Sequence, residues 1–568
     1  RSKLKGTSTY FGVVFGVFAC VFTRTDFVSS SAAHAEHPKY VLKSSVFREG
    51  WAAFWRDLTR AAIVVTLTTQ NICARYTQDL IMDIKLELEL GVAHASHQIE
   101  DKRKAYFKNC WDVFEESFPE ASTHPFMRGG KVGDSACLGY TQAISYVRVV
   151  AKAGYGIYRM SIEWARIQPH EEVFCATALE RYADIAKAVR DSGMKLYLCL
   201  CHYTCPQWFI AKGGWLSEQA PALFTRYVGY VADALAPFVD TFLTFNETNV
   251  VSSGYIFAGM PAVGPHAAAR LTYYAGRSTP PASEIMHRVN VHLLQSHAGA
   301  KEIIRGTVCK RVGLTISIQV MEGDSAQQPL GRAIQDMVYG NFIRLAYADE
   351  GLGSGVDDDL IGVQSYTTLK LHNLVAAPLL AAGNAALRVA NFIGVDTESL
   401  MSGMLERSAD IYLKPIGYSK YRTTQMNYDY EPLSAAHAVE EVRRLVPPSM
   451  HDRVEVTEFG IATPDDEERI QYYTEAIAGL RKARVTVGIA WSLVDNYEWN
   501  FGYPDASRPY ADGTLGPGPY FGLLKRPEEG VRVQSDKTSI KWDSLDEYFQ
   551  ALAKPSFTAL PLLAAGEN

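Results

Sequence analysis

Two glutamates in this sequence each stand at the end of a short β-rich run. Glu247 follows the run 241–245, and Glu458 follows the run 454–457. A pair of carboxyl groups, with one as acid and base and the other as nucleophile, is the equipment for hydrolysis of a glycosidic bond. One such glutamate alone is also typical of a solvated loop. The pair therefore indicates this chemistry only where the fold brings both strand ends to one mouth.

The elements that would position these glutamates alternate between strands and helices from about residue 84 onward. This alternation predicts a (β/α)8 TIM barrel with long βα-loops, preceded by an N-terminal membrane-associated helical region. Active-site side chains of such a barrel lie at the carboxyl ends of its strands, where both glutamates stand. The expected strands are 85–93, 156–163, 195–202, 240–247, 311–320, 359–366, 453–458 and 486–492, and the expected helices include 177–192, 217–238, 283–305, 435–445 and 466–484.

The composition bounds the class of protein. Of the 568 residues, 47% are hydrophobic and 21% are charged, which excludes a disordered or fibrous chain. A net charge of −6 without a basic block argues against a nucleic-acid partner. The mean hydropathy of −0.08 excludes a many-helix membrane protein but permits one or two membrane segments. No phosphate-cradling loop, metal-ligand cluster or cofactor fingerprint stands out, so no cofactor and no metal are expected.

Several motifs, in one consistent order, resemble those of a known family. Residues 244–247, Thr-Phe-Asn-Glu, resemble its Thr-Phe-Asn-Glu-Pro motif, and residues 456–460, Val-Thr-Glu-Phe-Gly, resemble its Ile-Thr-Glu-Asn-Gly motif. The runs 158–169 and 491–499 are similar to its second-strand and eighth-strand signatures. On these motifs the sequence resembles the β-glucosidase family, glycoside hydrolase family one, over about residues 90 to 550.

The resemblance implies a retaining mechanism with two glutamates. Glu458 would attack the anomeric carbon, and Glu247 would protonate the leaving oxygen and then activate the incoming water or alcohol. Asn246 would hold the sugar 2-hydroxyl, Arg159 would keep Glu458 ionised, and Tyr366 would hydrogen-bond the nucleophile. The positions that match the family's sugar-reading residues are Gln98, His202, Trp491, Glu498 and Trp499.

Structural roles stay open for several of these residues. Arg159 is also compatible with a barrel ion pair, His202 with a core histidine, and the two tryptophans with core packing. Cys199 and Cys201 alternate along the third strand and so are expected to share one face. Packing is the expected role of the two thiols, and a metal site with His202 would need further converging ligands.

The sequence departs from the family beside both glutamates. Thr248 stands where the family has Pro, and Phe459 stands where it has Asn. Gln364 replaces a usual Asn, and residues 202–206 read His-Tyr-Thr-Cys-Pro in place of His-Trp-Asp-Leu-Pro. Both carboxylates are retained, which favours activity. The changed surroundings leave open the sugar preference and an alternative function, a weak or inactive glycosidase-like subunit of a membrane protein complex.

The first 80 residues differ from the rest of the chain. The stretch 6–23 carries no charged side chain, and its centre, 10–22, is aromatic and aliphatic. A transmembrane anchor, a targeting segment and a buried terminal helix are three readings of this stretch. A second apolar stretch, 61–74, is too short to span a membrane comfortably and favours a helix that lies on a surface.

The expected domains are an N-terminal membrane-anchor or docking region (1–80), the barrel (81–555) with an insertion (371–415), and a C-terminal tail (556–568). The insertion is compatible with surface or membrane docking and with a core-packed hairpin. A short segment after the fifth strand and the apolar N-terminus resemble the membrane-bound branch of the family, which includes plant galactolipid galactosyltransferases.

The resemblance to that branch implies a membrane-associated retaining β-glycosidase or transglycosylase that acts on a β-glucoside, a β-galactoside or a glycolipid. The expected partners are a carbohydrate or glycolipid substrate, the membrane through the N-terminal region and a protein complex. The implied location is an organelle, such as a plastid, or the secretory pathway.

Overall fold

The structure is a computed structural model, and it describes the ranges 87–102, 107–117, 136–256, 264–308, 310–323, 332, 335–348, 357–371, 422–426, 428–504, 519–527 and 545–566. The predicted N-terminal membrane region, 1–80, lies outside the described residues, as does nearly all of the predicted insertion at 371–415. Within the described ranges, no helix is both long and apolar enough to cross a membrane.

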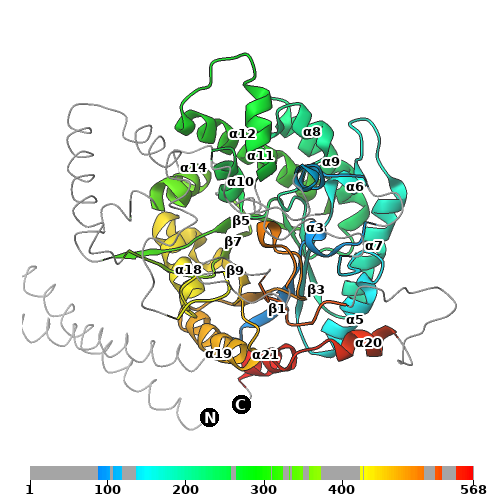
Figure 1. The fold of residues 1–568 in the computed structure, drawn as a ribbon, viewed down its shortest axis with the longest axis vertical. Helices are drawn as coiled ribbons and strands as arrows, with labels where there is room; N and C mark the ends of the chain where they lie inside the picture. Colours follow the sequence, from blue (N-terminus) through cyan, green and yellow to red (C-terminus); the bar gives the residue numbers. More distant parts are fainter. Residues whose placement is uncertain are drawn as a thin grey trace, which may run out of the picture. The chain divides into compact units, whose positions relative to one another are not determined.

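Eight parallel strands close into a barrel, and the prediction of a (β/α)8 TIM barrel is confirmed (Figure 1). Around the barrel the strands follow the order β1 (Glu89–Ala93), β10 (Val487–Trp491), β9 (Val454–Phe459), β7 (Leu360–Gln364), β5 (Arg311–Ser317), β4 (Thr241–Leu243), β3 (Lys195–Cys199) and β2 (Ile157–Ser161).

The strands bury both faces, as a parallel barrel requires. On β10, Val487, Ile489 and Trp491 belong to the smaller apolar cluster, which occupies alternate strand positions, whereas Ala490 belongs to the larger cluster shared with the helices. Since successive strand side chains point to opposite faces, the smaller cluster fills the inside of the barrel. The continuous apolar runs of the sequence form strands here because both faces need apolar cover.

Five long helices on the outside of the barrel match the predicted helical stretches: α7 (Ala176–Asp191), α9 (Ala220–Leu235), α12 (Ala282–Val308), α18 (Ser434–Leu445) and α19 (Asp466–Lys482) (Figure 1). The start of α19 shows a local cause. The side chain of Asp465 accepts hydrogen bonds from the backbone N–H groups of Glu467 (3.0 Å) and Glu468 (3.3 Å). This N-cap satisfies amides that a helix start leaves unpaired.

Shorter elements complete the described fold. The remaining helices and turns are α3 (Ser96–Ile99), α4 (Cys110–Glu116), α5 (Ala143–Lys152), α6 (Trp164–Ile167), α8 (Gln207–Ala211), η1 (Gly214–Leu216), α10 (Thr248–Gly254), α11 (Gly264–Tyr273), η2 (Asp336–Gly340), α14 (Asn341–Tyr347), η3 (Pro448–Arg453), η4 (Trp499–Phe501), α20 (Leu545–Ala551) and α21 (Pro555–Ala565). Outside the barrel, β6 (Met321–Gly323) pairs in parallel with β8 (Leu369–Leu371).

The segment expected as a C-terminal tail is largely α21, and this helix packs against the barrel domain. Phe557 and Leu560 are fully buried, and the backbone N–H of Ser556 donates to Asp466 at 2.7 Å. The hydroxyl of Tyr155 donates to the carbonyl of Phe557 at 2.8 Å. Through these contacts the segment forms part of the layer of helices outside the barrel.

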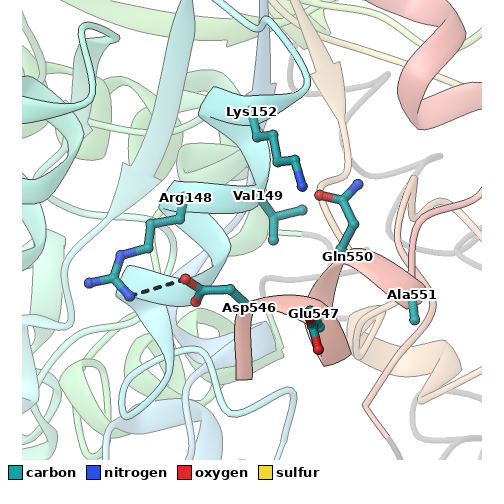
Figure 2. A pocket seen from close by; sticks show the side chains of 7 residues that line it. All are labelled: Arg148, Val149, Lys152, Asp546, Glu547, Gln550 and Ala551. Carbon is teal, nitrogen blue, oxygen red and sulfur yellow. Dashed lines mark hydrogen bonds and ion pairs between the residues drawn. The ribbon is translucent and has the colours of Figure 1, made fainter. Parts of the chain in front are cut away.

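A pocket of about 560 Å³ lies on the outside of the barrel, between α5 and α20. Figure 2 shows Arg148 of α5 in an ion pair with Asp546 of α20 (3.2 Å), with Lys152 and Gln550 directed towards each other nearby. None of the predicted site residues lines this pocket, so it is separate from the candidate active site.

Candidate active site

The ten predicted site residues all lie among the described residues, and most are buried. They come from strand ends that are far apart in the sequence, such as Gln98 and Glu498, which hydrogen-bond across 400 positions. Gln98 follows β1, Arg159 lies in β2, His202 follows β3, Asn246 and Glu247 follow β4, Tyr366 follows β7, Glu458 lies in β9, Trp491 ends β10, and Glu498 and Trp499 follow β10.

Glu458 is a buried carboxylate with two strong donors. The guanidinium of Arg159, which is 1% exposed, donates to Oε1 and forms an ion pair with it. The hydroxyl of Tyr366 donates to Oε2 at 2.5 Å. Hydrogen bonds that involve an ionised partner are short and strong, so these two donors fix the direction of the carboxylate and balance its charge.

Asn246 is held at both ends of its amide. Its oxygen accepts hydrogen bonds from Arg159 Nη2 (2.5 Å) and from Gln364 Nε2 (2.8 Å). Its nitrogen lies 3.1 Å from Nε2 of His202. Arg159 thus joins Asn246 to Glu458, and Gln364 fills the position of the family's usual Asn without removing a donor from this network.

Glu247 lies at the turn from β4 into α10. Its φ of 42° is in the left-handed region, which costs a non-glycine residue about 1–3 kcal/mol and marks a constrained position. Its backbone N–H donates to Oγ1 of Thr315 on β5 at 2.8 Å, and its carboxyl accepts from the hydroxyl of Tyr203. The strained backbone directs a 9% exposed carboxyl into the site.

The environments of the two glutamates differ in charge. Burial raises the pKa of Glu247 to about 7, the negative charge of Glu458 adds to the rise, and the hydrogen bond from Tyr203 and the charge of Arg159 oppose it. Burial also raises the pKa of Glu498 to about 8, again with a contribution from Glu458. One ion-paired carboxylate beside one carboxyl that titrates near neutral pH is the division of roles that acid/base catalysis needs.

Aromatic rings and amides surround these carboxyls. The ring of His202 stacks with Trp491 (6.0 Å, 22°) and with Trp499 (6.2 Å, 15°). Burial, and then the charge of Arg159, lower the pKa of His202 well below its usual value, so the imidazole is neutral. Gln98 Nε2 donates to Glu498 at 3.2 Å. Flat apolar rings beside polar groups suit the CH faces and hydroxyls of a sugar.

Several buried polar atoms at this end of the barrel have no hydrogen-bond partner among the described residues. They are Gln98 Oε1, Arg159 Nε, His202 Nδ1, Gln364 Oε1 and Asn496 Nδ2. A buried polar atom without a partner is costly and rare in a native protein. Atoms of this kind beside the two glutamates suit a site for a hydroxyl-rich ligand.

Sequence reasoning missed two residues of this network. Tyr203 contacts the carboxyl of Glu247, and Thr315 accepts from the backbone N–H of Glu247 and from Gln364 (3.0 Å). A signal for Thr315 was available, because Thr315 and Ser317 are polar residues at alternate positions near the carboxyl end of β5, where the preceding residues 312–314 are not polar. Tyr203 lies in a motif whose sequence shows only a departure from the family and no sign of this contact.

The expectation that Cys199 and Cys201 share one face is wrong. Cys199 ends β3 and belongs to the cluster inside the barrel, whereas Cys201 lies beyond the strand and belongs to the larger outer cluster. The period of two applies only while the chain is a strand. Over the described residues, no group of three or more His, Cys, Asp or Glu side chains is arranged to hold a metal ion.

The fold and the site together define a class of protein. A closed eight-stranded parallel barrel carries buried glutamates after β4 and in β9, and an arginine from β2 pairs with one of them. This is the architecture of a glycoside-processing enzyme built on a TIM barrel.

Comparisons with known proteins agree with this class. Residues 85–344 match the model described as "Glycosyl hydrolase family 1". Thermostable beta-glucosidase B of Thermobispora bispora is 25% identical over 460 residues, which cover 75% of this chain and 85% of that protein. Galactolipid galactosyltransferase SFR2, chloroplastic, of Arabidopsis thaliana is 26% identical over 391 residues, which cover 66% of this chain and 52% of that protein.

Solved structures show the same fold. A beta-glucosidase from Thermotoga maritima in complex with a calystegine derivative superposes with a TM-score of 0.62 at 20% identity, over 85% of this chain and 99% of that one. Over residues 85–344 the chain is thus similar to glycosyl hydrolase family 1, and these relatives support a retaining β-glycosidase-like protein of the hydrolase or transglycosylase type.

Proposed function

We propose that this chain is a membrane-associated retaining β-glycosidase or transglycosylase that acts on a β-glucoside, a β-galactoside or a glycolipid. The catalytic part of the proposal rests on a single observation. The two glutamates at one end of the barrel have different electrostatic environments. Glu458 is paired with Arg159 and Tyr366, while burial and the charge of Glu458 keep the pKa of Glu247 near 7.

In the first half-reaction an oxygen of Glu458 forms a bond to the anomeric carbon as the bond to the leaving oxygen breaks. Glu247 gives its proton to that oxygen and becomes ionised. In the second half-reaction Glu247 takes a proton from water or from an acceptor hydroxyl, whose oxygen attacks the anomeric carbon and releases Glu458. Because the acceptor needs only a hydroxyl, one site supports hydrolysis and transfer.

The remaining residues would bind and orient the sugar. The oxygen of Asn246 is occupied by Arg159 and Gln364, so its amide nitrogen is the end that is left to donate to the sugar 2-hydroxyl. Gln98 and His202 keep buried polar atoms that have no hydrogen-bond partner in the described part of the chain and that could bind further hydroxyls. Trp491 and Trp499, which stack with His202, would form apolar walls of the sugar site, and Glu498 offers a carboxyl beside Gln98.

The departures from the family motifs do not obstruct this site. Phe459 is fully buried in the outer cluster, where its ring packs edge-on against Tyr473 at 5.3 Å. Thr248 donates its hydroxyl to the carbonyl of Thr315 at 3.1 Å. Neither substitution places a new side chain between Glu247 and Glu458, which supports an active enzyme over the non-catalytic alternative.

The roles are tested with aryl β-glucosides and β-galactosides. Glu458→Gly with added azide should give a glycosyl azide of inverted configuration, because azide replaces the missing nucleophile in a single displacement. Glu247→Gly with azide should give the retained configuration, because azide then attacks the glycosyl-enzyme on the side of the missing base. Folded wild-type protein without any turnover would contradict the proposal and favour the glycosidase-like subunit of a membrane complex.

The lipid part of the proposal rests on the similarity to a galactolipid galactosyltransferase and on the uncharged stretch 6–23. A galactolipid presented in detergent micelles should serve as donor and acceptor and yield a lipid with a longer sugar head group. Binding to vesicles of the same galactolipid should be lost when residues 1–80 are removed. Hydrolysis with no transfer, together with unchanged vesicle binding, would limit the function to that of a β-glycosidase.

A further inference from the structure

The hydroxyl of Tyr203 donates to Oε2 of Glu247. Tyr203 lies in the loop after β3, and its side chain is nearly completely buried. The family motif that this loop resembles has Trp at this place, and an indole carries no hydroxyl. The contact is therefore a property of this chain rather than of the motif.

The surroundings fix the Tyr203 ring in this contact. Its φ of 66° lies in the left-handed region, as does that of Glu247, so both backbones are held in conformations that a non-glycine residue rarely adopts. The ring meets His202 edge-on (5.0 Å, 86°) and Trp499 edge-on (5.3 Å, 77°). Packing of this kind restricts the rotation that would carry the hydroxyl away from Glu247.

A hydroxyl that donates to a carboxyl stabilises its ionised form over its protonated form. We propose that Tyr203 is a positioning residue that stabilises ionised Glu247 and so increases, at a given pH, the fraction of Glu247 in the form that the second half-reaction requires, in which Glu247 removes a proton from water or from an acceptor hydroxyl. This inference rests on the proposed assignment of Glu247 as the acid/base. Tyr203 itself makes and breaks no covalent bond.

Other groups also act on Glu247 from the elements around it. They are Glu458 of β9, Arg159 of β2, Ser317 of β5, Tyr366 after β7, Tyr428, and Glu498 after β10. The substitution Tyr203→Phe changes none of them and keeps the ring that packs against His202 and Trp499. A change in the titration of Glu247 in this variant therefore reports the lost hydroxyl.

Two aryl glycosides separate the half-reactions. With a 4-nitrophenyl glycoside, kcat/KM has an alkaline limb that reports loss of the proton from the acid, Glu247. With a 2,4-dinitrophenyl glycoside the leaving group needs no proton, so kcat reports the second half-reaction and has an acidic limb from the same carboxyl acting as base. Tyr203→Phe should move both limbs to higher pH by about one unit. It should leave kcat/KM for the dinitrophenyl substrate nearly unchanged.

A second variant keeps the inference testable if Tyr203→Phe folds poorly. Replacement of Tyr203 by 3-fluorotyrosine keeps the ring and makes the hydroxyl a stronger donor, so both limbs should move to lower pH. Tyr197→Phe is the matched control, because it removes a buried hydroxyl that donates to Glu455 (3.0 Å), remote from the motif that holds Glu247. It should move neither limb.

The inference would be overturned if both limbs of the pH profiles stayed at the wild-type pH in both Tyr203 variants while the rates fell equally for both substrates. Tyr203 would then have only a packing role. Failure of the proposed function is recognised separately. In that case Glu247→Ala retains the alkaline limb of the wild type, because the limb then belongs to another group.

Discussion

Strand β9 carries two glutamates. Their ion-pair and hydrogen-bond partners are of the same kind, but their surroundings differ. Glu455, near the start of the strand, pairs with Arg311 at 2.6 Å and accepts from the hydroxyl of Tyr197 at 3.0 Å. Glu458, three residues later, pairs with Arg159 and accepts from the hydroxyl of Tyr366 at 2.5 Å. The same trio of carboxylate, guanidinium and phenol therefore occurs near both ends of one strand.

The difference lies in what surrounds each trio. The side chain of Arg311 is 43% exposed, whereas that of Arg159 is 1% exposed and also holds Asn246. The trio of Glu458 faces a second carboxyl, Glu247, whose pKa that charge helps to raise. An arginine–glutamate pair with a tyrosine hydroxyl is thus no mark of a catalytic site by itself. The second, poorly compensated carboxyl is what distinguishes the end of the barrel that we propose to be reactive from the other end.

The sharpest way to break this comparison is to neutralise each glutamate of β9 in turn. Glu458→Gln should lower kcat by about 10⁴-fold, because the nucleophile is lost. Glu455→Gln should change kcat by less than about threefold and should lower the free energy of unfolding by about 1–3 kcal/mol, because Arg311 loses an ionised partner. Aryl-glycoside kinetics and urea unfolding measure the two effects. A large loss of kcat in Glu455→Gln would mean that the two ends do not differ in kind.

The second carboxyl is tested by its dependence on the leaving group. Glu247→Gln should lower kcat/KM for a 4-nitrophenyl glycoside by about 10²–10³-fold, since the leaving oxygen then receives no proton from the enzyme. The loss should be much smaller for a 2,4-dinitrophenyl glycoside. In the wild type, kcat/KM for the first substrate should fall above about pH 7, because Glu247 then loses the proton that it must donate. Equal losses for both substrates would assign Glu247 to binding.

The two arginines give a third contrast. Arg159→Lys should lower kcat by about 10²-fold, because the single ammonium of lysine cannot replace the planar guanidinium that holds Glu458 and Asn246 together. Small misplacements of reacting groups are costly in rate. Arg311→Lys should leave kcat close to that of the wild type, since Glu455 keeps the hydroxyl of Tyr197. The pair is compared with one aryl glycoside at the pH optimum. A loss shared by both variants would point to general destabilisation.

The barrel and the positions of most candidate site residues at strand ends could be predicted, because both follow from local sequence. Eight apolar runs, each followed by an amphipathic stretch, suffice to define the strands. The strand-end motifs locate Glu247 and Glu458 without any knowledge of contacts. The sequence predicts a tail where α21 forms, because the burial of this helix depends on Phe557 and Leu560 meeting a surface that the sequence does not display.

Contacts that depend on loop conformation could not be predicted. The reach of Tyr203 to Glu247 needs positive φ angles at both residues, and residue type alone does not indicate such angles outside glycine. The prediction for Cys199 and Cys201 fails for a related reason, since a shared face requires that β3 continue past Cys199. Strand periodicity extends only to the end of a strand, and most of the chemistry begins there.

The smallest expected effect concerns stability and pH. The pKa of Glu247 is about 7 in the fold against an ordinary 4.5, so the folded protein binds more protons than the unfolded chain between these values. The stability that this proton provides is complete below pH 4.5 and is lost as the pH rises through 7. Between pH 5 and pH 8, Glu247→Gln should therefore lose less unfolding free energy than the wild type, by about 2 kcal/mol. Glu455→Gln is the control on the same strand, since it leaves Glu247 in place, and its slope should follow that of the wild type. Identical slopes for all three proteins in urea unfolding would remove the electrostatic distinction between the two ends of the barrel.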